Sequence, residues 1–388
     1  MNKQVANVQL MQKMNRLKVL NYVRRNPDSS RPVIAEKTGL SLASITNITT
    51  YLIEEGLLTE CGRETVSRVG RKSTLLRFGK DAYNLICVIL GEESICVTLT
   101  DLEGGIKTQL EASTGELSAQ EVMGAVRTQV KTLVESYGKE TILGIEIAIS
   151  GLVLEHSRFI VSTRLKWKSF DIKKMLEEET GINVFVNNIS FLRAVGYFCV
   201  NNSFESGNML LVDMESGIGS VQFFDGEISR GTLGEIGHTT VCKDGEPCFC
   251  GNRGCLEAMC SKKRILSIYE AYEGKKLTSL HEIETLFGEN DETAVFAVEE
   301  CGKYLGIGLA NLINLFNPSV IVINTGDFEE CPSLLEEAER EIHRRANRAL
   351  TENLIIKKVA QTREDTIRAG AFDLCDRIFD ISYEGNII

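Results

Sequence analysis

The sequence GEIGHTTVCKDGEPCFCGNRGCLEAMC, residues 234–260, decides the fold of the chain because it carries a metal-ligand pattern within one short segment. Cys248, Cys250 and Cys255 follow a C-x-C-x4-C spacing, with two glycines between the second and the third cysteine. Glycine allows a short loop to turn sharply, so the three thiolates can meet at one point. His238 lies ten residues upstream of Cys248 and would complete a Cys3His site. This ligand set is typical of structural zinc, held in a tetrahedral site with no open position.

The remaining cysteines leave alternatives open. Cys242 and Cys260 belong to the same segment and could replace one of the four ligands. The competing interpretation is a group of buried, reduced cysteines without a metal. The chain has twelve cysteines scattered along its length, and four of them crowd into residues 242–255. That distribution favours free thiols plus one metal site over a disulfide framework. We therefore predict structural Zn²⁺ as the cofactor.

Outward from this segment, short apolar runs alternate with helical patterns, which predicts an α/β architecture. The runs are LICVIL (85–90), ICVTL (95–99), ILGIEIAI (142–149), VFVN (184–187), MLLVDM (209–214) and VIVIN (320–324). A long apolar helix over residues 303–316 precedes the last of them. Residues 85–101 and 209–225 resemble each other, since each is two strands around a turn. Such internal similarity is expected of a two-lobed fold that is built from similar halves.

Residues 1–80 predict a winged helix-turn-helix. An apolar stripe from Asn15 indicates a helix that ends near Asn26, and a second helix fits residues 31–38 with a proline in its first turn. A tight turn with Gly39 precedes a third helix, for which Ser41 is a good N-cap. Apolar and basic residues then form a hairpin, with strands over residues 57–61 and 73–78.

The exposed face of the third helix carries small polar residues, so this helix can enter a major groove. Its predicted DNA contacts are Ser44, Asn47 and Thr50, and the predicted contacts of the hairpin are Arg63, Arg68, Arg71 and Lys72. The Asn47 amide can pair with adenine N6 and N7. The basic side chains would hold phosphates or enter the minor groove. The alternative is a three-helix module that touches protein only.

The charge distribution favours DNA binding by the N-terminal part. Residues 1–80 hold 14 Lys and Arg against 6 Asp and Glu, whereas the rest of the chain holds 29 against 48, for a net charge of −11. A basic region on an acidic body is expected where one end of a protein contacts phosphate. The sequence contains no apolar segment of membrane-spanning length and no secretory signal pattern, so we predict a cytoplasmic protein without a membrane partner.

The run from Gly234 to Glu257 resembles the signature of the ROK family (repressors, open reading frames and sugar kinases). The helix-turn-helix before it resembles the repressor branch of that family, the xylose-operon and N-acetylglucosamine repressors. The resemblance implies a winged helix-turn-helix over residues 1–80, followed by a two-lobed actin-like or hexokinase-like (ribonuclease H-like) ATPase-type fold. The first α/β lobe would cover residues 81–200, completed by a C-terminal helix at about 370–388. The second lobe would cover residues 201–369 and hold the zinc site.

The resemblance also implies a sugar in the cleft between the lobes. Carried over residue by residue, its binding positions would be Asn187, Asn188, Glu235, His238 and Glu257. A sugar needs several fixed carboxylate and amide partners, and His238 could bind zinc with one ring nitrogen and a sugar hydroxyl with the other. The alternative for both glutamates is a solvated surface or a position beside the zinc ligands.

The chain departs from the kinase pattern of the family at two places. Asn188 stands where a kinase has its aspartate base, and an amide cannot take the proton of a sugar hydroxyl. At the phosphate-binding turn the chain has ILGEE, residues 89–93, so Glu92 and Glu93 would repel a triphosphate. We therefore predict that the chain is not an enzyme.

The resulting hypothesis is a sugar-responsive transcription regulator, a repressor of carbohydrate-utilisation genes. Its partners would be a double-stranded DNA operator and a small sugar or sugar phosphate effector, and it would assemble as a homodimer or tetramer. Activation in place of repression stays open, as does a protein partner as effector. The two rival hypotheses are a sugar kinase with a DNA-binding appendage and a constitutive DNA-binding protein with a vestigial sugar cleft.

Overall fold

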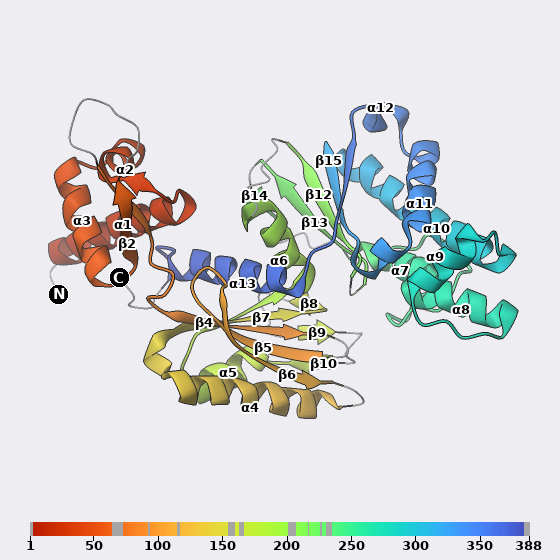
Figure 1. Cartoon of the computed structure of the whole chain (residues 1–388), viewed down its shortest axis with the longest axis horizontal. Helices are drawn as coiled ribbons and strands as arrows, with labels where there is room; N and C mark the ends of the chain where they lie inside the picture. The colour runs from red at the N-terminus through yellow and green to blue at the C-terminus, as the bar shows by residue number, and fades with distance from the viewer. Residues whose placement is uncertain are drawn as a thin grey trace.

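A computed structural model describes residues 3–63, 73–91, 94–114, 117–153, 160–162, 167–200, 207–215, 217–225, 227–229 and 235–383. Figure 1 shows three parts: an N-terminal helical domain and two α/β lobes, with one late helix, α13 (Arg363–Ile378), lying between them. The predicted α/β architecture with a helix-turn-helix in front is confirmed. Among the described helices, none is long and apolar enough to cross a bilayer.

The winged helix consists of three helices and a small antiparallel sheet. Its elements are α1 (Lys3–Arg25), β1 (Ser29–Ser30), α2 (Arg31–Thr38), α3 (Leu42–Glu54), β2 (Leu58–Arg63) and β3 (Thr74–Phe78), with strand order β1-β3-β2. Ser41 caps α3 as predicted, because its hydroxyl accepts a hydrogen bond from the Ser44 amide. Helix α1 starts at Lys3, twelve residues before Asn15, where the apolar stripe used for the prediction begins. The apolar stripe marks only its packed part, and Val8 and Met11 in the earlier turns are exposed.

The first lobe is built on a five-stranded sheet of order β11-β7-β4-β5-β6. Its elements are β4 (Asn84–Leu90), β5 (Ser94–Thr100), β6 (Ile106–Ser113), α4 (Ala119–Tyr137), β7 (Ile142–Ile149), α5 (Ile172–Thr180), β11 (Val184–Asn188) and α6 (Ile189–Val195). Side chains alternate along β4: Ile86, Val88 and Leu90 pack towards α4 and α5, while Leu85 and Cys87 pack towards α6 and α13. A small sheet, β8 (Leu152–Val153), β9 (Ile160–Ser162) and β10 (Trp167–Phe170), lies alongside.

The second lobe repeats the same strand order, β14-β13-β12-β15-β16. Its strands are β12 (Met209–Asp213), β13 (Gly219–Phe224), β14 (Glu227–Ile228), β15 (Val320–Asn324) and β16 (Ile355–Val359). Its helices are α7 (Leu256–Cys260), α8 (Lys262–Glu273), α9 (Leu280–Gly288), α10 (Glu292–Phe316), α11 (Pro332–Arg345) and α12 (Arg348–Thr351). In both sheets the first three strands are antiparallel and the fourth and fifth run parallel to the first. The predicted two-lobed fold of similar halves is therefore confirmed.

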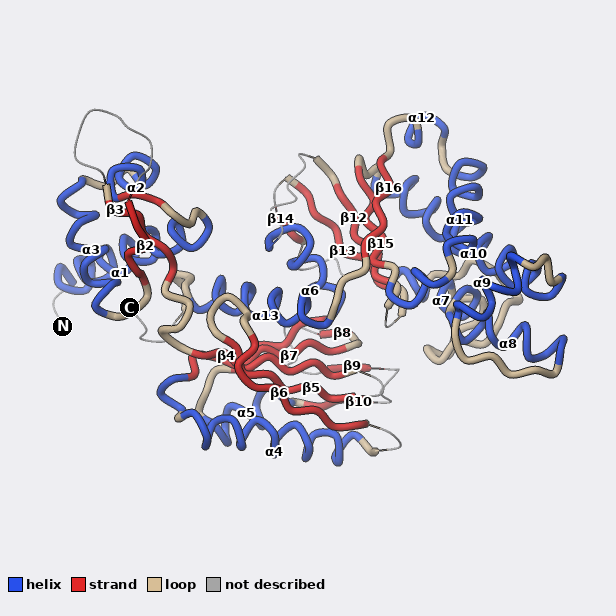
Figure 2. Tube along the Cα trace, viewed as in Figure 1, coloured by secondary structure: helices blue, strands red, loops and turns tan. Residues whose placement is uncertain are grey.

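Two helical segments lie between the two sheets (Figure 2). One is α6 with its continuation as a π-helix over Gly196–Val200, which packs on the second sheet through Phe198, whose ring stacks on Phe223. The other is α13, which packs on the first sheet and shares one core cluster with the winged helix. Helix α13 begins and ends several residues earlier than the expected C-terminal helix.

Candidate functional site

The Cys-rich segment folds into a compact loop that ends at α7. Thr240 forms an isolated antiparallel β-bridge with Cys255, and Pro247 forms a second one with Arg253. The loop therefore folds back on itself twice. Gly254 makes this path possible, because its φ is 65° and a Cβ at that position would lie 1.5 Å from the Cys242 carbonyl oxygen. Cys255 then occupies the N-cap position of α7, without a side-chain capping hydrogen bond.

This loop brings His238, Cys248, Cys250 and Cys255 together, with their ligand atoms all within 4.8 Å of one another. The Cys250 and Cys255 sulfur atoms are 3.6 Å apart, and His238 Nδ1 is 3.5 Å from Cys248 Sγ. A tetrahedron with Zn–S bonds of about 2.3 Å separates its sulfur atoms by about 3.8 Å. The four side chains thus fit one tetrahedral ion. Cys242 lies outside this group, and its sulfur accepts a hydrogen bond from the Tyr304 hydroxyl.

The electrostatics of the four-residue group also suit a cation. Burial, together with hydrogen bonds to the neighbouring thiols, raises the pKa of Cys255 to about 12. Three thiols that cannot all ionise beside one another become stable thiolates when a divalent cation joins them, with release of protons. The donor set therefore supports a possible metal site.

Two of the predicted sugar-binding carboxylates lie beside the metal loop. Glu257 on α7 is buried, and its Oε2 accepts a hydrogen bond from the Ile218 amide at 3.0 Å. Glu235 Oε2 is 3.8 Å from His238 Nε2, on the side of the ring away from the cysteines. Burial raises the pKa of the Glu235 carboxyl, although His238 opposes this shift. His238 thus has one nitrogen at the cysteines and the other at a partly exposed carboxylate.

The two predicted asparagines point to opposite faces of the first sheet, as neighbours on a strand must. The Asn188 amide donates to the Gly151 carbonyl at 2.9 Å, and its Oδ1 accepts from the Ser190 amide, capping α6. Asn187 is buried on the other face of the strand. Its amide donates to Glu146 and Asp373, and its carbonyl accepts from Arg377.

Asn188 is linked to the Glu257 region through the start of β13. A Cβ on Gly219 would lie 3.0 Å from the Ser190 hydroxyl, and Ile218, the preceding residue, donates to Glu257. Asn188, Glu235, His238 and Glu257 are therefore grouped around the junction of α6 and β13, where the two lobes meet.

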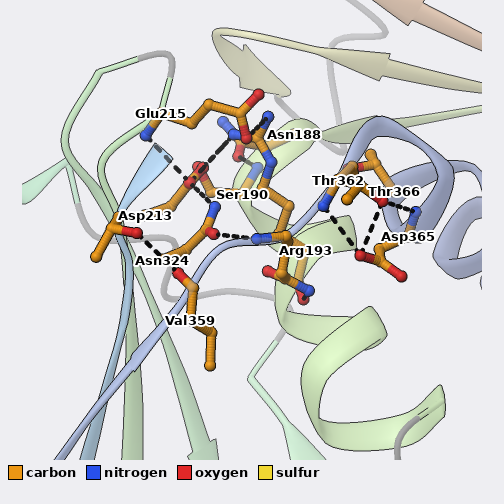
Figure 3. Close-up of polar contacts among 12 residues, drawn as sticks. Asn188, Ser190, Arg193, Asp213, Glu215, Asn324, Val359, Thr362, Asp365 and Thr366 are labelled. Carbon is orange, nitrogen blue, oxygen red and sulfur yellow. Dashed lines mark hydrogen bonds and ion pairs between the residues drawn. The ribbon is translucent and has the colours of Figure 1, made fainter. Parts of the chain in front are cut away.

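A second set of polar side chains, which the predictions from the sequence did not include, joins the lobes at this junction. We call Ser190, Arg193, Asp213, Glu215, Asn324 and Gln361 the inter-lobe network, and Figure 3 labels all of them except Gln361. Asp213 is 2% exposed and accepts hydrogen bonds from the Ser190 hydroxyl at 2.6 Å, from Arg193 at 2.8 Å and from Asn324 at 2.8 Å. Arg193 also pairs with Glu215 at 2.6 Å. Burial raises the pKa of Glu215, against the effect of Arg193.

One signal in the sequence could have indicated this network. Asp213 and Asn324 each end an apolar run, and polar residues at the carboxyl ends of neighbouring parallel strands meet at one edge of a sheet. Arg193 gives no comparable signal, because it lies within a short helix of the other lobe.

The predicted DNA contacts are displayed on the winged helix as far as it is described. Asn47 and Thr50 are exposed on α3, and Arg63 is exposed at the end of β2. Ser44 is half-buried, with its hydroxyl 2.9 Å from that of Ser41. The predicted residues Arg68, Arg71 and Lys72 lie outside the described residues, as do Glu92 and Glu93 of the phosphate-turn argument.

The family model with the description "ROK family" matches residues 85–378, which is well over half of the chain. The chain belongs to the ROK family. A second model, described as a winged helix-turn-helix DNA-binding domain, matches residues 15–59. The resemblance seen in the sequence is thus confirmed.

Relatives of this ROK protein share both parts. The xylose repressor of Bacillus spizizenii is 29% identical over 349 residues, covering 88% of this chain and 89% of the repressor. The DNA-binding transcriptional dual regulator NagC of Escherichia coli is 29% identical over 391 residues, covering 96% and 95%. A crystal structure of a ROK family transcriptional regulator, a homologue of the E. coli MLC protein, superposes with a TM-score of 0.77 at 22% identity, covering 96% and 98%. That structure supports the fold.

Proposed function

We propose that this ROK protein is a DNA-binding repressor of sugar-utilisation genes whose effector is a small sugar or sugar phosphate. The observation that carries the proposal is the fusion of an exposed, capped recognition helix to the ROK lobes through one continuous core. Relatives that match over both parts are a xylose repressor and a transcriptional dual regulator. Residues 1–80 would bind DNA, residues 81–200 with the C-terminal helix would form the first lobe, and residues 201–369 the second.

The DNA-binding part of the proposal predicts an effect of Asn47→Ala. The exposed Asn47 amide is proposed to pair with an adenine edge, and one bidentate base contact contributes about 1–3 kcal/mol of discrimination. We expect the affinity for the operator upstream of the chain's own gene to fall by about 5- to 150-fold, with little change for unrelated DNA. Fluorescence anisotropy titrations on both DNAs would measure this.

Arg63→Ala supplies the contrast. Loss of a phosphate contact should weaken binding to both DNAs equally. It should also reduce the slope of the logarithm of the binding constant against the logarithm of the salt concentration by about 1. Lys131→Ala on the exposed face of α4 serves as the control that changes neither. Unchanged operator affinity of Asn47→Ala would remove Asn47 from the recognition surface.

We propose that the four-residue group binds structural zinc. The ion would fix the loop that precedes α7 and hence the positions of His238 and Glu257. Glu235, Glu257, His238 and Asn188 would then hold the hydroxyls of a sugar at the junction of the lobes. Asn187 stays the fifth predicted position of this site, although its side chain is hydrogen-bonded to Glu146, Asp373 and Arg377.

The sugar site predicts an effect of Glu257→Gln. Glutamine keeps an oxygen for the Ile218 amide but loses the carboxylate charge, and a hydrogen bond to a charged group contributes about 1.5–3 kcal/mol. We expect the affinity for the effector to fall by about 10- to 150-fold. The effector is found first by thermal-shift screening with xylose, N-acetylglucosamine, glucose and their phosphates, and the affinity is measured by calorimetry.

Glu227→Gln, an exposed change on β14, is the matched control for Glu257→Gln and should leave binding unaltered. If no member of the panel changes the melting temperature or the operator affinity, the chain is a constitutive DNA-binding protein with a vestigial cleft.

The rival proposal is a sugar kinase with a DNA-binding appendage. The side chain of Asn188 caps α6 and holds the Gly151 carbonyl, and it carries no basic group. A coupled ATP assay with a panel of hexoses and pentoses tests the rival: turnover that is lost in Asn188→Ala would overturn the assignment as a non-enzyme. Assembly as a homodimer or tetramer and a cytoplasmic location complete the proposal.

A further inference from the structure

Helix α13, with the residues directly before and after it, links the three parts of the molecule (Figures 1 and 2). It follows β16 of the second lobe, crosses the first sheet and ends beside α1 of the winged helix. The contacts at its start, along its length and at its end differ in kind.

The short segment that leads into α13 is hydrogen-bonded to both lobes. Three residues separate Val359 of β16 from the first residue of α13, and at about 3.3–3.6 Å per residue they provide little slack. The middle one, Gln361, donates its backbone amide to Asn324 Oδ1 at 2.9 Å and its side-chain amide to the Arg193 carbonyl at 3.0 Å. Asn324 belongs to the second lobe and Arg193 to the first. A shift of one lobe against the other must therefore act on this connection.

The second half of α13 packs closely on the first sheet. A Cβ on Gly144 of β7 would lie 3.0 Å from Ile378 and 3.1 Å from Leu374. Asp373 is 1% exposed, and it accepts hydrogen bonds from Asn187 at 2.9 Å and from Arg377 at 2.7 Å.

The end of α13 contacts α1 through ion pairs and a hydrogen bond. Asp376 pairs with Arg24, whose side chain is 6% exposed, and with Arg25 at 3.0 Å. The carbonyl of Phe379 accepts a hydrogen bond from Asn21 at 3.0 Å. The ring of Phe379 also meets Phe78 of the wing edge-on, with the ring centroids 6.0 Å apart.

Helix α1 in turn supports the recognition helix. The Arg16 guanidinium lies 3.6 Å from the centroid of the Tyr51 ring on α3. Leu20 of α1, Leu52 of α3 and Phe379 belong to one buried cluster. The orientation of α3 therefore depends on where α1 and the end of α13 lie.

We infer that α13 couples the relative position of the two lobes to the orientation of the recognition helix. Gln361 connects the start of this helix to both lobes, and Asp376 connects its end to α1. The consequence for DNA rests on the proposed function, whereas the coupling itself does not. A continuous chain of packed and hydrogen-bonded contacts between two parts of a protein can carry such coupling, and variants along it test whether it does.

Hydrogen exchange followed by mass spectrometry on the full chain tests the inference without sugar or DNA. Gln361→Ala should raise exchange in residues 15–25 and 42–54 by about 2- to 10-fold, the factor expected for one or two lost hydrogen bonds. Asp376→Asn, and Arg24→Met from the opposite side, should raise exchange in the same segments. In the Asp376→Asn background, Gln361→Ala should add nothing there, because the path is already broken.

Arg368→Ala is the matched control, since its side chain is exposed on α13 and lies 4.0 Å from Asp365. It should leave both segments unchanged. The inference is overturned if Gln361→Ala leaves residues 15–25 and 42–54 at wild-type rates, or if its effect and that of Asp376→Asn add. Because no ligand is present, a protein that bound neither DNA nor sugar would still give a clear result for the coupling.

Discussion

Cys255→Ser is expected to yield a purified chain without stoichiometric zinc and with a markedly lower melting temperature. Cys255 is fully buried, its sulfur lies 3.6 Å from that of Cys250, and it directly precedes α7. A metal held at a thousand times its Kd stabilises the folded state by about 4 kcal/mol. In a domain of the size of the second lobe, that corresponds to about 8–16 °C. Elemental analysis by mass spectrometry and thermal denaturation of the same samples would measure both effects.

Cys242→Ser is the matched control for this prediction. Cys242 belongs to the same segment, but its sulfur contacts the Tyr304 hydroxyl and lies outside the four-residue group. The control variant should keep one zinc per chain. Zinc lost from Cys242→Ser and kept in Cys255→Ser would reverse the ligand assignment. No zinc in the wild-type protein would leave a cluster of reduced thiols, the alternative raised by the sequence.

The metal loop could be predicted from the sequence because its determinants are local. The cysteine spacing, the turn glycines and the position of His238 all lie within eighteen residues, so chain connectivity brings the ligands together. The same holds for α2 and for the Ser41 cap of α3. Apolar runs also predicted β4, β5, β7, β11, β12 and β15, whereas no run predicted the edge strands β6 and β16.

The sugar-site prediction shows where local information ends. Alternation along a strand requires Asn187 and Asn188 to face opposite sides. Which of them is buried depends on the neighbouring α13, whose Asp373 accepts a hydrogen bond from Asn187. That contact joins residues 186 positions apart, and no residue near Asn187 in the sequence indicates that the contact exists. Similarly, the packed stripe of α1 could be predicted, but its exposed early turns could not.

The inter-lobe network was invisible for the same reason. Arg193 is buried, yet a lone arginine in a short helix is more often a surface residue. Its carboxylate partners lie on a loop and a strand end of the other lobe, about twenty residues on. Only the tertiary arrangement reveals that its charge is offset, and this leads to the second large effect that we expect.

Arg193→Ala is expected to destabilise the two lobes by about 3–5 kcal/mol, the cost of leaving a buried charge without its partner. Without the guanidinium, Asp213 keeps neutral donors alone, the Ser190 hydroxyl, the Asn324 amide and the Glu215 backbone amide, while it stays 2% exposed. The guanidinium lies between two carboxylates, so its loss also sets Asp213 and Glu215 against each other. Urea denaturation followed by circular dichroism would measure the change in the free energy of unfolding.

Two further variants separate this buried pair from an ordinary ion pair. Lys131→Ala breaks the exposed Lys131–Glu135 contact and should cost less than about 0.5 kcal/mol. Arg193→Met combined with Asp213→Asn removes both buried charges and should recover part of the loss, because the uncompensated carboxylate is then gone. If Arg193→Ala costs no more than Lys131→Ala, the network contributes nothing measurable to holding the lobes together. If the double variant is less stable than Arg193→Ala, the cost comes from lost packing and not from the unpaired charge of Asp213.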